Sequence, residues 1–280
     1  MKNILITGAR GNVGSEVMKH FLPSSAQRVW TSSRNKSAVG KNVLYFDFKD
    51  LKESVKSLEE IDVLFLLRPP DIADVKKYFV PLIKACQQLG VKHIVFLSVQ
   101  GADTTSYIPH AKIEKLIVAS GINYTFIRPS YFMQNLTTIL LGDIKTRRRI
   151  FLPAGNAPFL WVDVEDVGRA IAEILKDVSL HQNKIYTITG DDLVPFGDVA
   201  KMISDELNEK VKYVSPSLAR FYRVKRKQGL ARGYIMVMIM LHYLPRFQKL
   251  PQVSTDFKTV VHRNPGSLKE FIKGNKYVWV

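Results

Sequence analysis

The chain has 280 residues, of which 46% are hydrophobic and 24% are charged, a composition typical of a globular protein with one large domain or a domain and a smaller partner. A single cysteine, Cys86, excludes an intramolecular disulfide and is consistent with a reducing, cytoplasmic compartment. We expect Cys86 to be a buried core residue and not a nucleophile. The longest apolar run, Tyr234 to Leu244, is too short to span a bilayer. The net charge of +16 favours anionic partners in general, but no nucleic-acid motif accompanies it, so we expect no specific nucleic acid and no membrane span.

Short apolar runs alternate with helical patterns through the first half of the chain. They predict strands at 3–7, 28–33, 43–48, 62–67, 93–99 and 124–130, and helices at 12–21, 75–90 and 110–121. The strands are nearly continuous in Val, Ile, Leu and Phe, as strands buried on both faces are. This alternation predicts an α/β fold with a Rossmann-type doubly wound parallel sheet.

The pattern changes beyond about residue 135. A strand and a helix are predicted over 159–175, with Asp163 or Asp166 capping the helix. A strand at 184–190, a helix at 195–208, a short strand at 210–215 and a basic helical segment at 216–247 follow. We expect an NAD(P)-binding Rossmann domain over 1–135 and a smaller α/β substrate-binding lobe over 136–280, packed on it and supplying part of the sheet.

Three glycines, Gly8, Gly11 and Gly14, follow the first strand and open the first helix. Glycine allows a tight turn and close approach of the backbone to a phosphate, and the helix N-terminus offers unpaired N–H groups to an anion. The turn therefore predicts a pyrophosphate site at Gly8, Arg10, Gly11, Asn12, Val13 and Gly14, with a structural turn that holds no ligand as the alternative. The spacing T-G-x-x-G-x-x-G resembles that of the short-chain dehydrogenase/reductase superfamily.

The end of the second strand predicts which cofactor is used. It carries Ser32, Ser33 and Arg34, with Lys36 close behind, and lacks the acidic residue that would bind the ribose 2′-hydroxyl of NAD. Arg34 can instead fork onto a 2′-phosphate, so we expect NADPH (NADP) to be favoured over NADH, with a plain surface arginine as the alternative. The resemblance further implies that Asp47 and Phe48 hold the adenine and that Leu67, Arg68 and Pro69 border the ribose and pyrophosphate.

The catalytic Tyr-x-x-x-Lys pair of that superfamily is incomplete here. Lys112 is the matching lysine, but Ile108 stands where the tyrosine belongs and Tyr107 is one position out of register. The segment that follows resembles the NmrA-like branch of the atypical short-chain reductases, which lacks this tyrosine. The matching residues are Lys112, Glu114, Gly121, Tyr124, Thr125, Arg128, Pro129, Phe132, Met133 and Asn135.

The resemblance implies an NADPH-dependent oxidoreductase that transfers hydride to a quinone or similar small apolar acceptor. Lys112 and Tyr131 are the catalytic candidates, and Tyr131, Phe132 and Asn135 the candidates for the substrate pocket. Further cofactor contacts are expected at Ser98, Val99, Gln100, Lys112 and Pro129. His110 is interpreted as a surface histidine, and no metal site is expected.

Because Ile108 cannot transfer a proton, a second hypothesis is a non-catalytic NAD(P)-sensing regulatory protein that binds a protein partner. The basic segment from about 217 to 249 is interpreted as a helical cover over the substrate pocket, with a partner surface as its alternative. A homodimer is left open.

Overall fold

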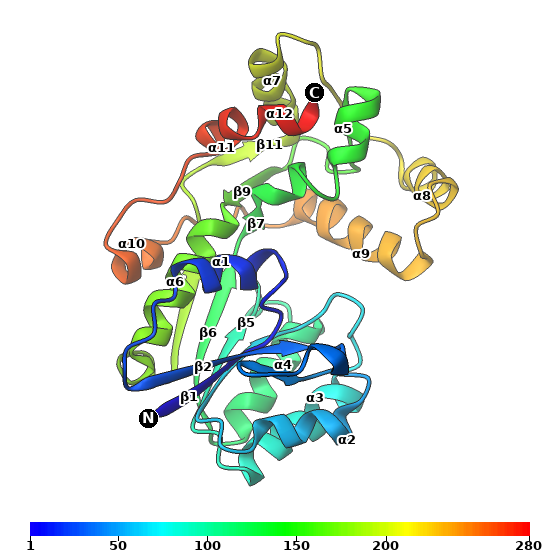
Figure 1. Ribbon diagram of the computed structural model, residues 1–280. Helices are drawn as coiled ribbons and strands as arrows, with labels where there is room; N and C mark the ends of the chain where they lie inside the picture. The colour runs from blue at the N-terminus through cyan, green and yellow to red at the C-terminus, as the bar shows by residue number, and fades with distance from the viewer. The chain divides into compact units, whose positions relative to one another are not determined.

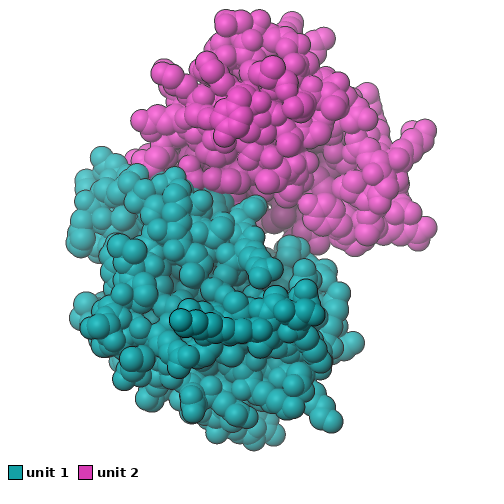
Figure 2. Space-filling view, viewed as in Figure 1, with its two compact units in different colours: residues 1–130, 164–188, 254–264 teal, residues 131–163, 189–253, 265–280 magenta.

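The computed structural model describes residues 1–280 (Figure 1). It forms two compact units, drawn in different colours in Figure 2. Unit 1 comprises residues 1–130, 164–188 and 254–264, and unit 2 comprises residues 131–163, 189–253 and 265–280. The units are thus interleaved along the chain, whereas the sequence predicts a single boundary after residue 135. The assignment of substrate binding to the second part stays a prediction.

Unit 1 is built on a seven-stranded sheet in the order β10-β6-β5-β4-β1-β2-β3. Every neighbouring pair of strands in it is parallel. The strand order reverses beside β1, so the predicted doubly wound parallel sheet is confirmed. The strands are β1 (Lys2–Ile6), β2 (Gln27–Ser33), β3 (Val43–Tyr45), β4 (Val63–Leu67), β5 (His93–Leu97), β6 (Asn123–Pro129) and β10 (Lys184–Ile188).

Helices cover both faces of this sheet, as Figure 1 shows. One face carries α1 (Asn12–His20), α6 (Val164–Lys176) and α10 (Asp256–Val261), and the other α2 (Leu51–Ser54), α3 (Val75–Gln88) and α4 (Pro109–Ala119). A Cβ on Gly168 of α6 would lie 2.4 Å from the Cβ of Glu16 on α1, so this glycine lets the two helices meet closely. Under α3 and α4 lies a core that includes Leu64, Phe79 and the fully buried Cys86, whose thiol pKa burial raises to about 12.

Unit 2 has its own core around Trp161, Phe196, Phe221 and Trp279. A three-stranded sheet has the order β11-β9-β7, and a parallel pair joins β12 to β8. No helix of either unit combines the length and apolarity needed to cross a bilayer. The elements are β7 (Tyr131–Phe132), β8 (Arg149–Phe151), β9 (Pro158–Val162), β11 (Leu193–Pro195), β12 (Lys212–Val214), α5 (Leu141–Arg147), α7 (Phe196–Leu207), α8 (Leu218–Lys227), α9 (Arg232–Tyr243), α11 (Leu268–Gly274) and α12 (Lys276–Trp279).

The predicted strands and helices are present, with shifted ends. The third strand stops at Tyr45 instead of residue 48, because the chain turns there and the Asp50 N–H donates to the Asp47 carbonyl oxygen at 3.0 Å. The short elements β7, β8, β11, α2, α5, α10, α11 and α12 are not predicted from the sequence. Elements this short depend on tertiary packing, which local periodicity does not encode.

Candidate functional site

A cavity of about 580 Å³ opens in unit 1 at the carboxyl ends of β1, β2 and β4. This is the place where the strand order reverses, and in open parallel sheets it is the usual ligand crevice. The cavity collects side chains and backbone from several loops that the sheet brings to one edge. Its lining residues are Thr7, Gly8, Arg10, Gly11, Ser32, Ser33, Arg34, Asn35, Phe46, Asp47, Phe48, Lys49, Leu67, Pro69, Pro70, Asp71 and Ile72.

The glycine turn forms the floor of this cavity. Gly8 has a φ of +67°, which favours glycine, and its carbonyl oxygen accepts the Gly11 N–H at 2.8 Å. A Cβ on Gly14 would lie 2.1 Å from that same carbonyl oxygen, so only glycine lets α1 start against the turn. No side chain caps the N-terminus of α1. The first N–H groups of α1 and its positive dipole end thus remain available to an anion.

Two arginines line the cavity without forming an ion pair. Arg10 lies in the glycine turn and Arg34 follows β2, and both are exposed. A third cation, Lys49, is paired with Asp71 at 3.0 Å between Nζ and Oδ2. The residues at the end of β2 include no carboxylate, since Ser32, Ser33 and Arg34 occupy that place. The cavity therefore presents to a ligand two guanidinium groups that form no ion pair.

Not every predicted cofactor residue lines this cavity. Lys36 instead pairs with Asp50 at 3.5 Å and lies 4.8 Å from the centre of the Tyr45 ring. Arg68 donates to the carbonyl oxygens of Pro69 and Ile72 at 3.0 and 2.9 Å, and holds the loop after β4. Asn12, Val13 and Gly14 lie on α1 beside the turn, outside the lining set. Pro69 lines the cavity as predicted. The lining residues that are not predicted are Asn35, Phe46, Lys49, Pro70, Asp71 and Ile72, all within three residues of a predicted position.

The interpretation of His110 as a surface histidine is wrong. Its ring is partly buried, and its Nε2 accepts a hydrogen bond from Arg68 Nε at 3.2 Å. Burial lowers the pKa of His110 to about 3, with the Arg68 charge as a second cause, so the imidazole is neutral. This bond ties the loop after β4 to the first turn of α4.

A buried polar network lies at the carboxyl ends of β5 and β6. Glu114 on α4 accepts two hydrogen bonds from Arg128 on β6, one from Nε to Oε1 at 3.0 Å and one from Nη2 to Oε2 at 2.6 Å. The Ser98 hydroxyl donates to the same Oε1 at 2.5 Å. Ser98, Glu114 and Arg128 are all buried. The network locks the start of the loop after β5 to α4 and β6.

Lys112 lies on α4, two residues before Glu114 in sequence. Its side chain is exposed and forms no ion pair, unlike the buried Glu114. The neighbouring loop is fixed because the Ser98 and Gln100 N–H groups donate to the Ile127 and Pro129 carbonyl oxygens at 2.7 and 2.9 Å. Lys112 can therefore donate hydrogen bonds to a ligand from a rigid support.

The predicted substrate residues belong to unit 2. Tyr131 and Phe132 form β7, Asn135 follows in a short 3₁₀ helix, and all three are partly buried. His242 Nδ1 lies 2.6 Å from the Met238 carbonyl oxygen and so must donate to it, which leaves Nε2 to accept from the Tyr131 hydroxyl at 2.9 Å. Burial raises the pKa of Tyr131, which keeps this hydroxyl protonated. His242 is not predicted from the sequence, because its helical neighbours give no signal of this contact.

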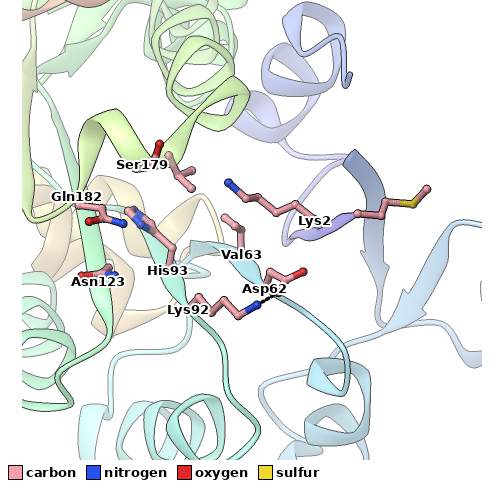
Figure 3. Close-up of a pocket in the computed structure, with 10 residues that line it drawn as sticks. Lys2, Asp62, Val63, Lys92, His93, Asn123, Ser179 and Gln182 are labelled. Carbon is pink, nitrogen blue, oxygen red and sulfur yellow. Dashed lines mark hydrogen bonds and ion pairs between the residues drawn. The ribbon is translucent and has the colours of Figure 1, made fainter. Parts of the chain in front are cut away.

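A second cavity of about 360 Å³ opens at the opposite edge of the unit 1 sheet, and Figure 3 shows its lining. His93 Nε2 lies 2.8 Å from the Thr125 hydroxyl, which itself donates to the His181 carbonyl oxygen at 2.8 Å. His93 therefore donates from Nε2, and its buried Nδ1 is left as an unpartnered acceptor. Burial lowers the pKa of His93 to about 4. None of the predicted site residues lines this cavity.

A sequence profile of the NmrA-like family matches residues 1–254. The chain belongs to the NmrA-like family. It is similar to the uncharacterized oxidoreductase YesF of Bacillus subtilis (strain 168), with 27% identity over 99% of this chain and 96% of the relative. It is also 26% identical to the NAD(P)H azoreductase of Xenophilus azovorans, over 97% of each chain. An NADPH complex of the quinone oxidoreductase QOR2 from Escherichia coli has the same fold, with a TM-score of 0.81 at 22% identity over 97% of this chain and 99% of that one.

The main cavity of this NmrA-like chain suits an extended ligand that carries phosphates. The glycine turn removes side chains from its floor, the uncapped helix offers N–H donors, and Arg10 and Arg34 supply positive charge. The same sheet edge continues past β4 to the rigid loop at Ser98 and the exposed ammonium of Lys112. This edge can bind an anionic group near β1 and β2 and position a reacting group near β5.

Proposed function

We propose that the chain is an NADPH-dependent reductase that transfers hydride to a quinone or a similar small apolar acceptor. The observation that carries the proposal is the cavity of about 580 Å³ at the strand-order switch, with its glycine floor and two unpaired arginines. The family and the oxidoreductase relatives support a redox role. The NAD(P)-sensing alternative is not favoured, because two relatives matched over nearly their whole length are named as an oxidoreductase and an azoreductase.

Different residues along the sheet edge would bind different parts of the cofactor and the acceptor. The N–H groups at the start of α1 and Arg10 would bind the pyrophosphate, and Arg34 would bind the 2′-phosphate of NADPH. Asp47 and Phe48 would flank the adenine. The loop at Ser98 to Gln100 would support the nicotinamide end, and Lys112 would hold the adjacent ribose or the acceptor oxygen.

Bound NADPH supplies a hydride, which is one proton and two electrons. Reduction of a quinone to its hydroquinone needs that hydride and one further proton, and the hydroquinone anion is stable enough for solvent to supply it. Lys112 can stabilise the developing oxyanion through its ammonium group. Tyr131 is proposed to line the acceptor pocket with Phe132 and Asn135. We do not propose it as the proton donor, because its hydroxyl donates its hydrogen bond to His242. This chemistry does not require the tyrosine that Ile108 replaces.

The test is to follow nicotinamide absorbance with purified protein, NADPH or NADH, and a panel of quinones, azo dyes and aldehydes. We expect turnover with quinones or azo dyes and a higher kcat/KM with NADPH than with NADH. Turnover confined to aldehydes would contradict the acceptor assignment. Equal kcat/KM with the two cofactors would contradict the role of Arg34.

A further inference from the structure

The stretch from residue 210 to residue 255 is the most basic part of the chain. It contains no Asp or Glu, yet the net charge of the whole chain is only +16 because acidic residues are spread elsewhere. Its cations are Lys210, Lys212, Arg220, Arg223, Lys225, Arg226, Lys227, Arg232, Arg246 and Lys249. Helices α8 and α9 form the centre of this stretch, and Figure 1 shows them adjacent in yellow and orange.

Four of these cations gather on one exposed surface of unit 2. Arg223, Arg226 and Lys227 of α8 and Arg232 at the start of α9 line a shallow depression of about 630 Å³. None of the four forms an ion pair, whereas Lys225 on the other face of α8 is buried and pairs with Asp143 at 2.7 Å. The depression thus presents a basic patch, defined by these four residues, that no acidic group of the chain neutralises.

An exposed apolar helix face follows the basic patch directly. On α9, Ile235, Met238 and His242 are buried in unit 2. The opposite side of the helix carries Met236, Val237 and Leu241, which are 56%, 45% and 50% exposed. These positions recur at helical spacing, so they form one continuous face. The chain continues with Phe247 and Leu250, which are 70% and 62% exposed.

We propose that α8 and α9 dock on the surface of an anionic lipid bilayer. An apolar helix face beside a cluster of Lys and Arg is the pattern of a helix that lies in the interface, with apolar side chains among the acyl chains and cations among the headgroups. A nucleic acid would bind the basic patch but would leave the apolar face in water. A second copy of the chain would bring two unneutralised basic patches together.

The test is sedimentation of the full-length protein with vesicles of phosphatidylcholine alone or with phosphatidylglycerol added. We expect binding to the anionic vesicles that weakens as salt rises. Each cation near the surface contributes about 1 kcal/mol, which is about fivefold in partitioning, so the triple variant R223Q/K227Q/R232Q should bind about 100-fold less. The double variant V237Q/L241Q should lose at least about tenfold, because it removes apolar side chains but no charge.

A matched control carries K52Q, K84Q and K269Q, which remove three exposed lysines that form no ion pair and lie elsewhere on the surface. It should bind the anionic vesicles within about threefold of the wild type, because these lysines lie outside the patch. Thermal unfolding of every variant checks that the fold is intact. The proposal would be overturned if the control variant lost as much vesicle binding as the triple patch variant. It would also be overturned if V237Q/L241Q bound the anionic vesicles as tightly as the wild type.

Two further outcomes would assign the surface differently and overturn the proposal. Tighter binding to duplex DNA than to anionic vesicles, unaffected by V237Q/L241Q, would make it a nucleic-acid surface. Dimerisation that V237Q/L241Q abolishes, without vesicle binding, would make the apolar face a contact between copies. All these readouts are independent of reductase turnover, so they stand or fall separately from the proposed function.

Discussion

Arg128 and Glu114 form a bidentate ion pair, with hydrogen bonds of 3.0 and 2.6 Å, inside unit 1. Both residues are at most 8% exposed, and the pair joins β6 to α4. The Glu114 carboxylate raises the pKa of Arg128. Because α4 also carries Lys112, the pair fixes the helix on which the proposed catalytic ammonium lies.

Removing one member of this pair should destabilise the protein strongly. Glu114→Gln leaves the buried guanidinium with only the exposed Asp103, 3.5 Å from Nη1, as a counter-charge. Loss of one partner costs about 3–5 kcal/mol in typical buried pairs. Urea unfolding at neutral pH measures the loss. The double variant Glu114→Met with Arg128→Met should recover most of it, since no buried charge remains. A single variant within about 1 kcal/mol of the wild type would show that the pair does not hold α4.

Gly14→Ala should prevent the cofactor from binding. Its Cβ would lie 2.1 Å from the Gly8 carbonyl oxygen, so α1 and the turn must move apart, at a cost of about 1–3 kcal/mol or more. Thermal unfolding and NADPH titration measure the two effects. Gly142→Ala is the control, because that position lies in α5 with open space around it and alanine favours helix. Normal NADPH affinity in Gly14→Ala would contradict the proposed role of the turn.

Arg34→Ala should weaken NADPH binding and leave NADH binding unchanged. A charge-assisted hydrogen bond contributes about 1.5–3 kcal/mol, which corresponds to a rise of about tenfold to a hundredfold in the Kd for NADPH. Arg28→Ala is the matched control, because Arg28 lies on β2, which Arg34 follows, but stacks on Trp30 outside the cavity. A parallel loss of affinity for both cofactors would show that Arg34 does not read the 2′-phosphate.

Lys112→Ala should lower kcat by about a hundredfold or more, the usual contribution of a positioned proton donor or oxyanion stabiliser. The Kd for NADPH should change much less. Lys112→Arg, which keeps the charge, should retain more activity than the alanine variant. Lys115→Ala is the control, because this lysine is exposed on the same helix one residue beyond Glu114. Unchanged turnover in Lys112→Ala would exclude Lys112 from the mechanism.

The buried His93 should make the protein less stable in acid. Its folded pKa of about 4 lies below the ordinary value of 6.5, so between these values the unfolded state binds a proton that the folded state does not. Stability is full above pH 6.5 and falls as the pH drops towards 4, at about 1.4 kcal/mol per pH unit. When the pH is lowered from 7 to 5, the free energy of unfolding should fall by about 2 kcal/mol less in His93→Gln than in the wild type. An identical decrease in both proteins would contradict a neutral His93.

The fold and the glycine-turn end of the candidate site were predictable because both are specified by short-range sequence patterns. Gly8, Gly11 and Gly14 have a spacing that specifies a turn, and the sheet then brings Asp47 and Leu67 to the same cavity. The orientation of long side chains was not predictable. Lys36 and Arg68 each find partners that only the folded chain supplies, and Lys49 reaches the cavity from a turn.

Unit 2 was harder to predict for a related physical reason. The contact between Tyr131 and His242 joins residues 111 positions apart, and nothing in either local sequence signals it. Its short strands β7, β8 and β11 are too brief for a period of two to emerge. Glu114 matches the sequence pattern of the NmrA-like family, but only the structure shows that it is buried and that Ser98 and Arg128 are its hydrogen-bond partners.

The most direct test of the central proposal is a single-turnover experiment. The protein is held in excess over NADPH so that all the cofactor is bound, it is mixed rapidly with excess of a benzoquinone, and the absorbance of the reduced nicotinamide is followed. The proposed reductase predicts loss of all the bound NADPH in one turnover, at a rate far above that of NADPH and quinone without protein. Stoichiometric NADPH binding with absorbance that decays no faster than in the protein-free control would contradict it and favour a nucleotide sensor.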